Sequence, residues 1–195
     1  MHAKRRAILV PAPLIAVALV VVGAGCSGGD DKRVSLGEGG RPSASATPSP
    51  SFATNDPVQA FLGWFDAVYR AERSLDPNHP GLTKYGQGPA LADIRQRIAS
   101  FRAQGVRLDK PDVVKQPRIS GSGRPRGKLV NEVAACVTEP PDNFVDVKSG
   151  RPRAPEGADG NGLTSKFVGV MVLMADGWHI DGGHVEDVKS CSAVG

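Results

Sequence analysis

The sequence lacks an apolar run long enough to cross a membrane as a helix. Its most apolar stretch, residues 7–22, is interrupted by Pro11 and Pro13, and a spanning helix needs roughly 20 such residues. The basic residues 4–6 precede this stretch, and the small residues 23–25 follow it. A basic start, a short apolar core and small residues before a cleavage point are the pattern of a secretory signal. The sequence therefore predicts export from the cytoplasm.

The residues at the end of this segment indicate where the signal is cleaved. Ala24, Gly25 and Cys26 resemble the lipobox of bacterial prolipoproteins, although Gly23 stands where that family usually has an aliphatic residue. The resemblance implies a signal peptide over residues 1–25 and diacylglycerol on the Cys26 thiol, which would hold the chain at the outer face of the cell membrane. Two alternatives stay open: a plain secretory cut that leaves Cys26 unmodified, and a twin-arginine export route in place of the ordinary one.

Large apolar side chains are also scarce in residues 26–55, which are rich in Gly, Ser and Pro. Such a composition cannot offset the entropy of ordering, so this segment is predicted to be a disordered tether. As a flexible chain it would span roughly 30 Å on average. Residues 56–195 then remain for a single extracytoplasmic domain with one core.

The mature chain has almost no net charge. The signal holds three of the 24 basic residues, and the chain has 20 acidic ones. Charge therefore gives no reason to expect nucleic acid as a partner.

Cysteine is rare, with three residues in the chain. If Cys26 carries the lipid, Cys136 and Cys191 remain as a pair in an oxidising compartment, where a disulfide is expected. The bridge would close a loop of about 55 residues and stabilise the domain by at most roughly 4 kcal/mol. Two buried thiols or a metal pair are the alternatives.

The first half of the domain has helical periodicity. Pro57 opens a helix with Asp56 or Asn55 as its cap, and Pro89 begins a second long helix that Gly105 ends. The apolar stripe of the first helix comprises Val58, Phe61, Leu62, Phe65, Val68 and Tyr69.

The second half has the alternation of strands. The expected strands are residues 106–108, 113–119, 129–137, 144–148, 167–175 and 178–185. Pro117 favours an edge position for the second of these, and residues 167–175, apolar on both faces, favour a central one. Asp176 and Gly177 predict a hairpin turn. The fold class is therefore α+β, with helices packed on a mostly antiparallel sheet.

A family resemblance adds to this outline. Residues 61–69, 77–80, 85–88 and 90–91 resemble a group of small actinobacterial lipoproteins. That group is similar in element order to the nuclear-transport-factor-two-like fold, which ketosteroid isomerase and polyketide cyclases share. The resemblance implies a curled, cone-like sheet around the helices, with room for a small apolar ligand in its mouth. Fold does not fix function.

No motif of metal binding or catalysis is strong in this sequence. A possible pocket is assembled from Trp64, Asp66, Tyr69 and Tyr85, although Asp66 is expected to face water. His179, Asp181 and His184 would need a bulge at residues 182–183 to approach a metal. A regular strand instead places His179 and Asp181 on a solvated face opposite Trp178 and Ile180. No metal, cofactor or catalytic residue is therefore expected.

A patch for an anionic partner is the remaining candidate. If residues 129–137 and 144–148 pair about the turn at residues 140–141, six basic residues meet at one end of the hairpin. These residues are Arg124, Arg126, Lys128, Lys148, Arg151 and Arg153.

The sequence thus favours a non-catalytic, membrane-tethered module that binds an envelope protein or an anionic wall polymer. A carrier of a small apolar ligand, or an isomerase or dehydratase, is the alternative.

Overall fold

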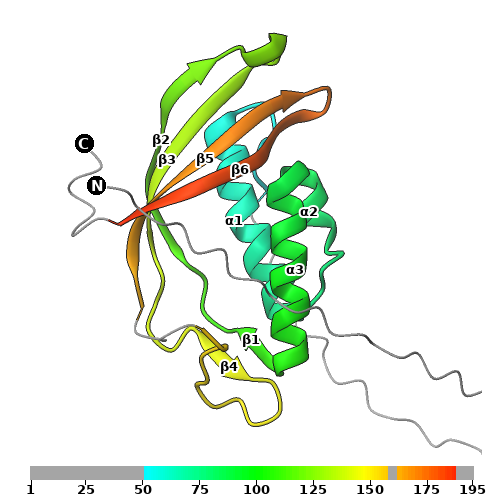
Figure 1. The fold of residues 1–195 in the computed structure, drawn as a ribbon, viewed down its shortest axis with the longest axis vertical. Helices are drawn as coiled ribbons and strands as arrows, with labels where there is room; N and C mark the ends of the chain where they lie inside the picture. The colour runs from blue at the N-terminus through cyan, green and yellow to red at the C-terminus, as the bar shows by residue number, and fades with distance from the viewer. Residues whose placement is uncertain (1–50, 158–161, 188–195) are drawn as a thin grey trace, which may run out of the picture. The chain divides into compact units, whose positions relative to one another are not determined.

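The computed structural model describes residues 51–157 and 162–187. In this part of the chain, three α-helices precede all six strands. Figure 1 shows α1 and α3 on the same side of a four-stranded sheet. The α+β class expected from the sequence is confirmed. None of the described helices is long and apolar enough to cross a membrane.

Helix α1 (Pro57–Ser74) begins where the sequence predicts. The Asp56 side chain accepts hydrogen bonds from the backbone N–H groups of Val58, at 2.8 Å, and Gln59, at 2.9 Å. These bonds satisfy two of the donors that a helix start leaves without partners. The helix ends at Leu75, whose left-handed backbone turns the chain away.

Two further helices follow. Helix α2 (Pro80–Tyr85) is a short turn of helix, and helix α3 (Gly88–Gln104) is the second long helix that the sequence predicts. Gly105 ends α3 in a left-handed conformation with a φ of 68°, which glycine adopts without steric cost.

The four-stranded sheet is antiparallel throughout, in the order β2-β3-β5-β6. Its strands are β2 (Val113–Gly123), β3 (Val130–Thr138), β5 (Thr164–Met174) and β6 (Gly177–Asp187). Strand β2 lies at an edge and β5 is central, as predicted, and β5 and β6 form the hairpin expected at Gly177. Two irregularities in β2 and one between β5 and β6 break the ladder. Such bulges bend a sheet.

The pairing of the remaining two strands differs from the prediction. Strand β4 (Phe144–Asp146) pairs with β1 (Val106–Leu108) in a separate two-stranded sheet, and not with β3. The β3 positions that were assigned to β4 are taken by β2 on one side and β5 on the other. The predicted hairpin about residues 140–141 is therefore wrong.

The core lies between the helices and one face of the sheet. Phe61 and Trp64 of α1 are buried against Val133 of β3, Met171 of β5 and Ile180 of β6. Burial of one such side chain contributes about 1.5–3 kcal/mol. Helix α1 therefore holds the sheet and the other helices in one packed unit.

The folded unit begins before Asp56, where the predicted tether ends. The backbone N–H of Trp178 donates to the carbonyl of Thr54 at 2.7 Å, and the Tyr85 hydroxyl donates to the carbonyl of Phe52 at 3.1 Å. Phe52 also packs on the core. The domain boundary therefore moves from residue 56 to Phe52 or earlier, while the signal peptide, Cys26 and the rest of the tether lie outside the described residues.

Cys136 is fully buried on β3. It pairs with Lys166 of β5, which in turn pairs with Glu186 of β6, so two strand spacings, about 10 Å, separate Cys136 from Glu186. Five residues of chain reach up to about 17 Å, which suffices for Cys191 to meet Cys136. Cys191 itself lies outside the described residues, so the bridge stays a prediction.

The cap of α1 provides a test of the helix start. Replacing Asp56 by Ala removes both side-chain hydrogen bonds and is expected to lower the free energy of unfolding by about 0.5–2 kcal/mol. Asp56→Asn, which keeps an acceptor, should lie within a few tenths of a kcal/mol of the wild type. Urea titration followed by circular dichroism measures both, and equal stability of Asp56→Ala and the wild type would contradict the assignment.

The predicted disulfide is tested by reduction. Dithiothreitol should lower the free energy of unfolding of the wild type by about 2–4 kcal/mol and raise its mass by two hydrogens. Cys191→Ser should show the lowered stability at the outset and no response to dithiothreitol. A wild type that is equally stable with and without reductant would show that the bridge is absent.

Candidate functional site

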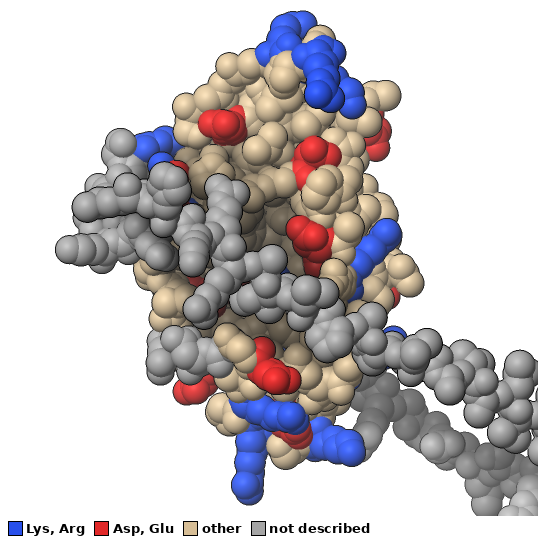
Figure 2. Space-filling view, in the orientation of Figure 1, with Lys and Arg blue, Asp and Glu red and all other residues tan. Residues whose placement is uncertain are grey.

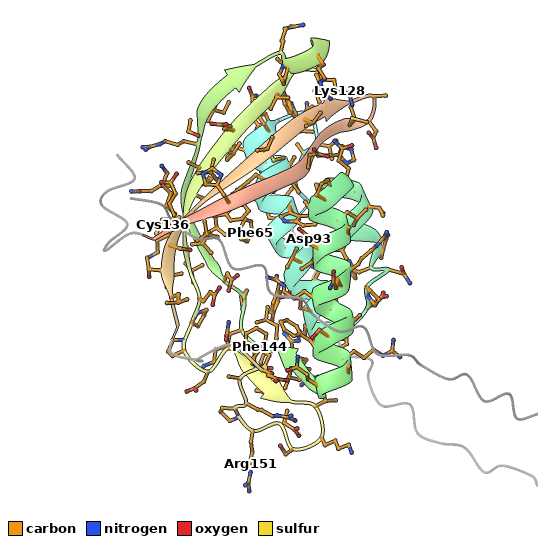
Figure 3. All side chains as sticks on the ribbon, viewed as in Figure 1. Phe65, Asp93, Lys128, Cys136, Phe144 and Arg151 are labelled. Atoms are coloured by element: carbon orange, nitrogen blue, oxygen red, sulfur yellow. The ribbon has the colours of Figure 1, made fainter. Side chains whose placement is uncertain are left out.

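A cavity of about 500 Å³ lies where α1 and α3 face the sheet. Figure 2 shows the hollowed face, with acidic groups along it and basic groups gathered at the two ends of the domain. Phe65 on α1 and Asp93 on α3 both line this cavity (Figure 3). Its volume is in the range of small-molecule sites, which are usually 300–1,000 Å³.

Most of the cavity wall is apolar. Phe65 of α1 stands edge-on to Phe167 of β5, with ring centroids 5.5 Å apart. Trp64, Val137 and Ile180 continue this wall and are nearly excluded from solvent. A ligand with an apolar body would therefore displace water from apolar surface on entering.

One part of the wall carries an ion pair between a buried carboxylate and a half-exposed arginine. Glu72, near the end of α1, is 3 % exposed, and its Oε1 lies 2.6 Å from Nη2 of Arg97 on α3. No hydrogen bond of regular geometry reaches Oε1 from the residues that the structure describes. Burial raises the pKa of Glu72, and the Arg97 guanidinium opposes this rise. A buried carboxylate held by one partner is costly to desolvate.

A second carboxylate stands next to this pair. Asp112, in the loop between β1 and β2, has its pKa raised to about 6, mainly by burial and then by the negative charges of Glu139 and Glu72. Arg97 counteracts part of this effect. Carboxyl groups with raised pKa values in a cleft mark candidate functional sites. Glu72, Arg97, Asp112 and Glu139 thus form one charged part of the cavity wall.

The structure brings together three of the four residues predicted for the pocket. Trp64, Asp66 and Tyr69 line the cavity. Asp66 is bound by Arg70, one helical turn away, with 2.8 Å between Oδ2 and Nε. Tyr85 is not among the lining residues, because it packs beneath α1 with its hydroxyl bonded to Phe52.

The predicted acid–base pair of an isomerase is not assembled by these residues. The Tyr69 hydroxyl donates to the carbonyl of Asp109 at 3.1 Å and accepts a hydrogen bond from Nη1 of Arg73 at 2.7 Å. The proton of the Tyr69 hydroxyl is therefore held in the hydrogen bond to the backbone carbonyl of Asp109. A general acid must be within hydrogen-bond reach of the reacting group and free to transfer its proton.

The histidines of β6 do not form a metal site. His179 is 6 % exposed and its Nε2 lies 3.0 Å from Oδ1 of Asp176, so the prediction of a solvated His179 is wrong. The ladder irregularity falls at Asp181 and places His184 on the same face as His179. Their partners on β5, Val172 and Val168, are four residues or about 13 Å apart. No group of three metal ligands occurs among the described residues.

The predicted basic patch is divided. Arg124, Arg126 and Lys128 lie around the turn between β2 and β3, whereas Lys148, Arg151 and Arg153 follow β4. Figure 3 shows Lys128 and Arg151 at opposite ends of the domain. The patch was predicted from a β3–β4 pairing that does not exist, so it is wrong as a single surface. Arg153 is moreover paired with Asp146, with 2.9 Å between Nη1 and Oδ2.

Four polar lining residues escaped the sequence analysis. Glu72 follows Val68 and Tyr69 at helical spacing, so extending the apolar stripe by one turn would have placed a carboxylate on the buried face of α1. Arg97, Asp112 and Glu139 come from separate elements, and no spacing in the sequence joins them. Their association depends on the tertiary fold.

Comparison with known proteins identifies similar folds. No family model and no curated protein matches the chain. Among solved structures, the chain is similar to the intermembrane-space region of the chloroplast protein ARC6, with 15 % identity and a TM-score of 0.49 over 71 % of this chain and 100 % of that one. The periplasmic domain of DotI has 10 % identity and a TM-score of 0.45, covering 70 % and 99 %.

An NTF2-like superfamily protein from Salmonella enterica is also similar, with 13 % identity and a TM-score of 0.35 over 68 % of this chain and 92 % of that one. A nuclear-transport-factor-two-like protein is thus among the structural neighbours, as the sequence resemblance predicts. Similarity at such low identity concerns the fold alone. The actinobacterial lipoprotein part of the resemblance stays a prediction.

The raised pKa of Asp112 predicts how stability varies with pH. Because the pKa is raised from 3.8 to about 6 in the folded state, the folded protein binds this proton more tightly than the unfolded chain. Its contribution to stability is fully present below about pH 4 and is lost as the pH rises through 6. Asp112→Asn should therefore be more stable relative to the wild type at pH 7.5 than at pH 4.5, by about 1–2 kcal/mol.

Urea titrations at the two pH values measure this difference. The exposed Asp93, which lines the same cavity, supplies the matched control variant Asp93→Asn. If the stability difference between Asp112→Asn and the wild type did not change with pH, the pKa of Asp112 would not be raised by folding.

Proposed function

We propose that this domain is a non-catalytic binding protein for a small molecule, held at the outer face of the membrane by the lipid on Cys26. The cavity of about 500 Å³ between the helices and the sheet is the observation that carries the proposal. Its wall is mainly apolar with a few convergent polar groups, which is the usual composition of a ligand site. The membrane address rests on the sequence pattern of residues 1–26.

Binding is favoured over chemistry by the state of the polar groups. Asp66 is occupied by Arg70, and the Tyr69 hydroxyl is occupied by Asp109 and Arg73. Among the described residues, neither Asp66 nor the Tyr69 hydroxyl is therefore free to act as the acid that an isomerase would place opposite its base. The carboxylates instead give the cavity a fixed polarity, which orients a ligand.

Small-molecule binding is also favoured over docking of a wall polymer or an envelope protein through the basic residues. That alternative depends on six charges acting together, and the fold divides them into two groups of three. Charges on exposed and separate turns contribute little to affinity because solvent and salt screen them.

Native mass spectrometry of the full chain, purified gently from its own membranes, tests the proposal. The wild type should carry a small molecule that is lost on denaturation. Ala90→Phe fills part of the cavity at the start of α3 and should lower the occupancy several-fold. Ala99→Phe places the same side chain on the exposed face of the same helix and should retain the ligand.

Two results would contradict this function. One is a wild type without any small-molecule adduct, and the other is equal occupancy in Ala90→Phe and Ala99→Phe. The second result would mean that the adduct binds elsewhere.

A further inference from the structure

We propose that the ligand of this cavity is a small organic cation, an amine or quaternary ammonium with an apolar body, whose charge lies against Asp112 and Glu139. This inference rests on the proposed function and specifies the chemical class of the ligand. It is carried by the charge balance of the cavity wall together with the shape of the cavity.

The residues that line the cavity include more acids than bases. Among the described residues that line the cavity, Arg97 is the only base. The acids that line it are Asp66, Glu72, Asp93, Asp112 and Glu139.

Two of these acids are neutralised within the protein. Glu72 is paired with Arg97 at 2.6 Å, and Asp66 is paired with Arg70 at 2.8 Å. Asp93, Asp112 and Glu139 have no ion pair with a basic residue among the described residues. The cavity therefore holds an excess of negative charge, which a cationic ligand would complement and an anionic ligand would meet with repulsion.

The position of this charge strengthens its effect. Of the three carboxylates without an ion pair, Asp112 is partly buried, whereas Asp93 and Glu139 are exposed. Charges interact more strongly where water is excluded, because the local dielectric constant is lower. The pKa of Asp112 is raised first by burial and then by repulsion from Glu139 and Glu72, and a bound cation would relieve this repulsion.

A metal ion does not fit this arrangement. No three of the carboxylates are close enough to coordinate one ion among the described residues, and metal–oxygen bonds need about 2.0–2.6 Å. A cavity of about 500 Å³ with a mainly aromatic and aliphatic wall instead has room for the body of an organic molecule. Phe65, Phe167 and Trp64 supply aromatic surface for the body of such a molecule.

Three indole compounds of similar size and different charge show whether the cavity prefers a cationic, a neutral or an anionic ligand. Tryptamine is a cation at pH 7.5, tryptophol is neutral and indole-3-propionate is an anion. The full chain is placed in nanodiscs of zwitterionic lipid, with empty discs as the blank, and each compound is titrated calorimetrically. Tryptamine should bind at least about tenfold more tightly than tryptophol, and indole-3-propionate more weakly than both.

Variants assign this preference to the carboxylates. Asp112→Asn and Glu139→Gln should each reduce the ratio of tryptamine to tryptophol affinity several-fold. Asp142→Asn, at an exposed turn outside the cavity wall, is the control and should keep the wild-type ratio. Lowering the pH from 7.5 to 5 should also reduce the wild-type ratio, because Asp112 takes up a proton near pH 6.

Each outcome separates this inference from the function on which it rests. Equal affinities for tryptamine and tryptophol, or a preference that survives in Asp112→Asn and Glu139→Gln, would overturn the cation assignment and leave small-molecule binding intact. Failure of all three compounds to bind, together with the absence of any adduct in native mass spectrometry, would overturn both.

Discussion

The packing of helix α1 on the sheet is the contact on which the rest of the domain depends. Phe61 of α1 is completely buried against β5. Gly169 of β5 lies so close to Phe61 that a Cβ added to this glycine would be 2.8 Å from the Phe61 ring. This contact fixes the separation of helix and sheet at one end. Because the aromatic side chains Phe65 and Phe167 continue the same row without filling the space beyond them, the cavity opens where the packing ends.

The polar wall of the cavity is a second consequence of this arrangement. Glu72 lies on the face of α1 that packs inward, beyond the last apolar residues of the stripe, and α3 brings Arg97 to it. The loop before β2 then adds Asp112 to the same volume. Removing Arg97 would leave the buried Glu72 carboxylate uncompensated, whereas the half-exposed Arg97 would stay in contact with solvent if Glu72 were removed. The pair therefore couples the geometry of the site to the stability of the fold.

The elements that local signals specify could be predicted, and those that depend on distant contacts could not. Asp56, Pro57 and Gly105 define helix ends through their own backbone chemistry, so α1 and the end of α3 agree with the sequence analysis. The β5–β6 hairpin was equally recognisable from Asp176 and Gly177.

The partner of β4 was not recognisable, because a proline-rich turn between two strands suggests a hairpin, whereas the actual partner β1 lies about forty residues earlier. The cavity residues likewise divide into those that local signals indicate and those that depend on distant contacts. Trp64, Asp66 and Tyr69 share one helix and could be grouped by periodicity, but nothing local joins Asp112 and Glu139 to them. The buried state of His179 was likewise beyond a strand pattern, since alternation predicts which face a side chain is on and not what covers that face.

The attachment of Thr54 to the β5–β6 hairpin has a mechanical consequence. The carbonyl of Thr54 accepts the Trp178 N–H, and its hydroxyl donates to the carbonyl of Asp176. A pulling force transmitted along the preceding chain would load the contacts of Phe52 first and these hydrogen bonds next, and would reach the start of α1 only after both break. The attachment of Phe52 and Thr54 to the folded unit thus shields helix α1 from tension.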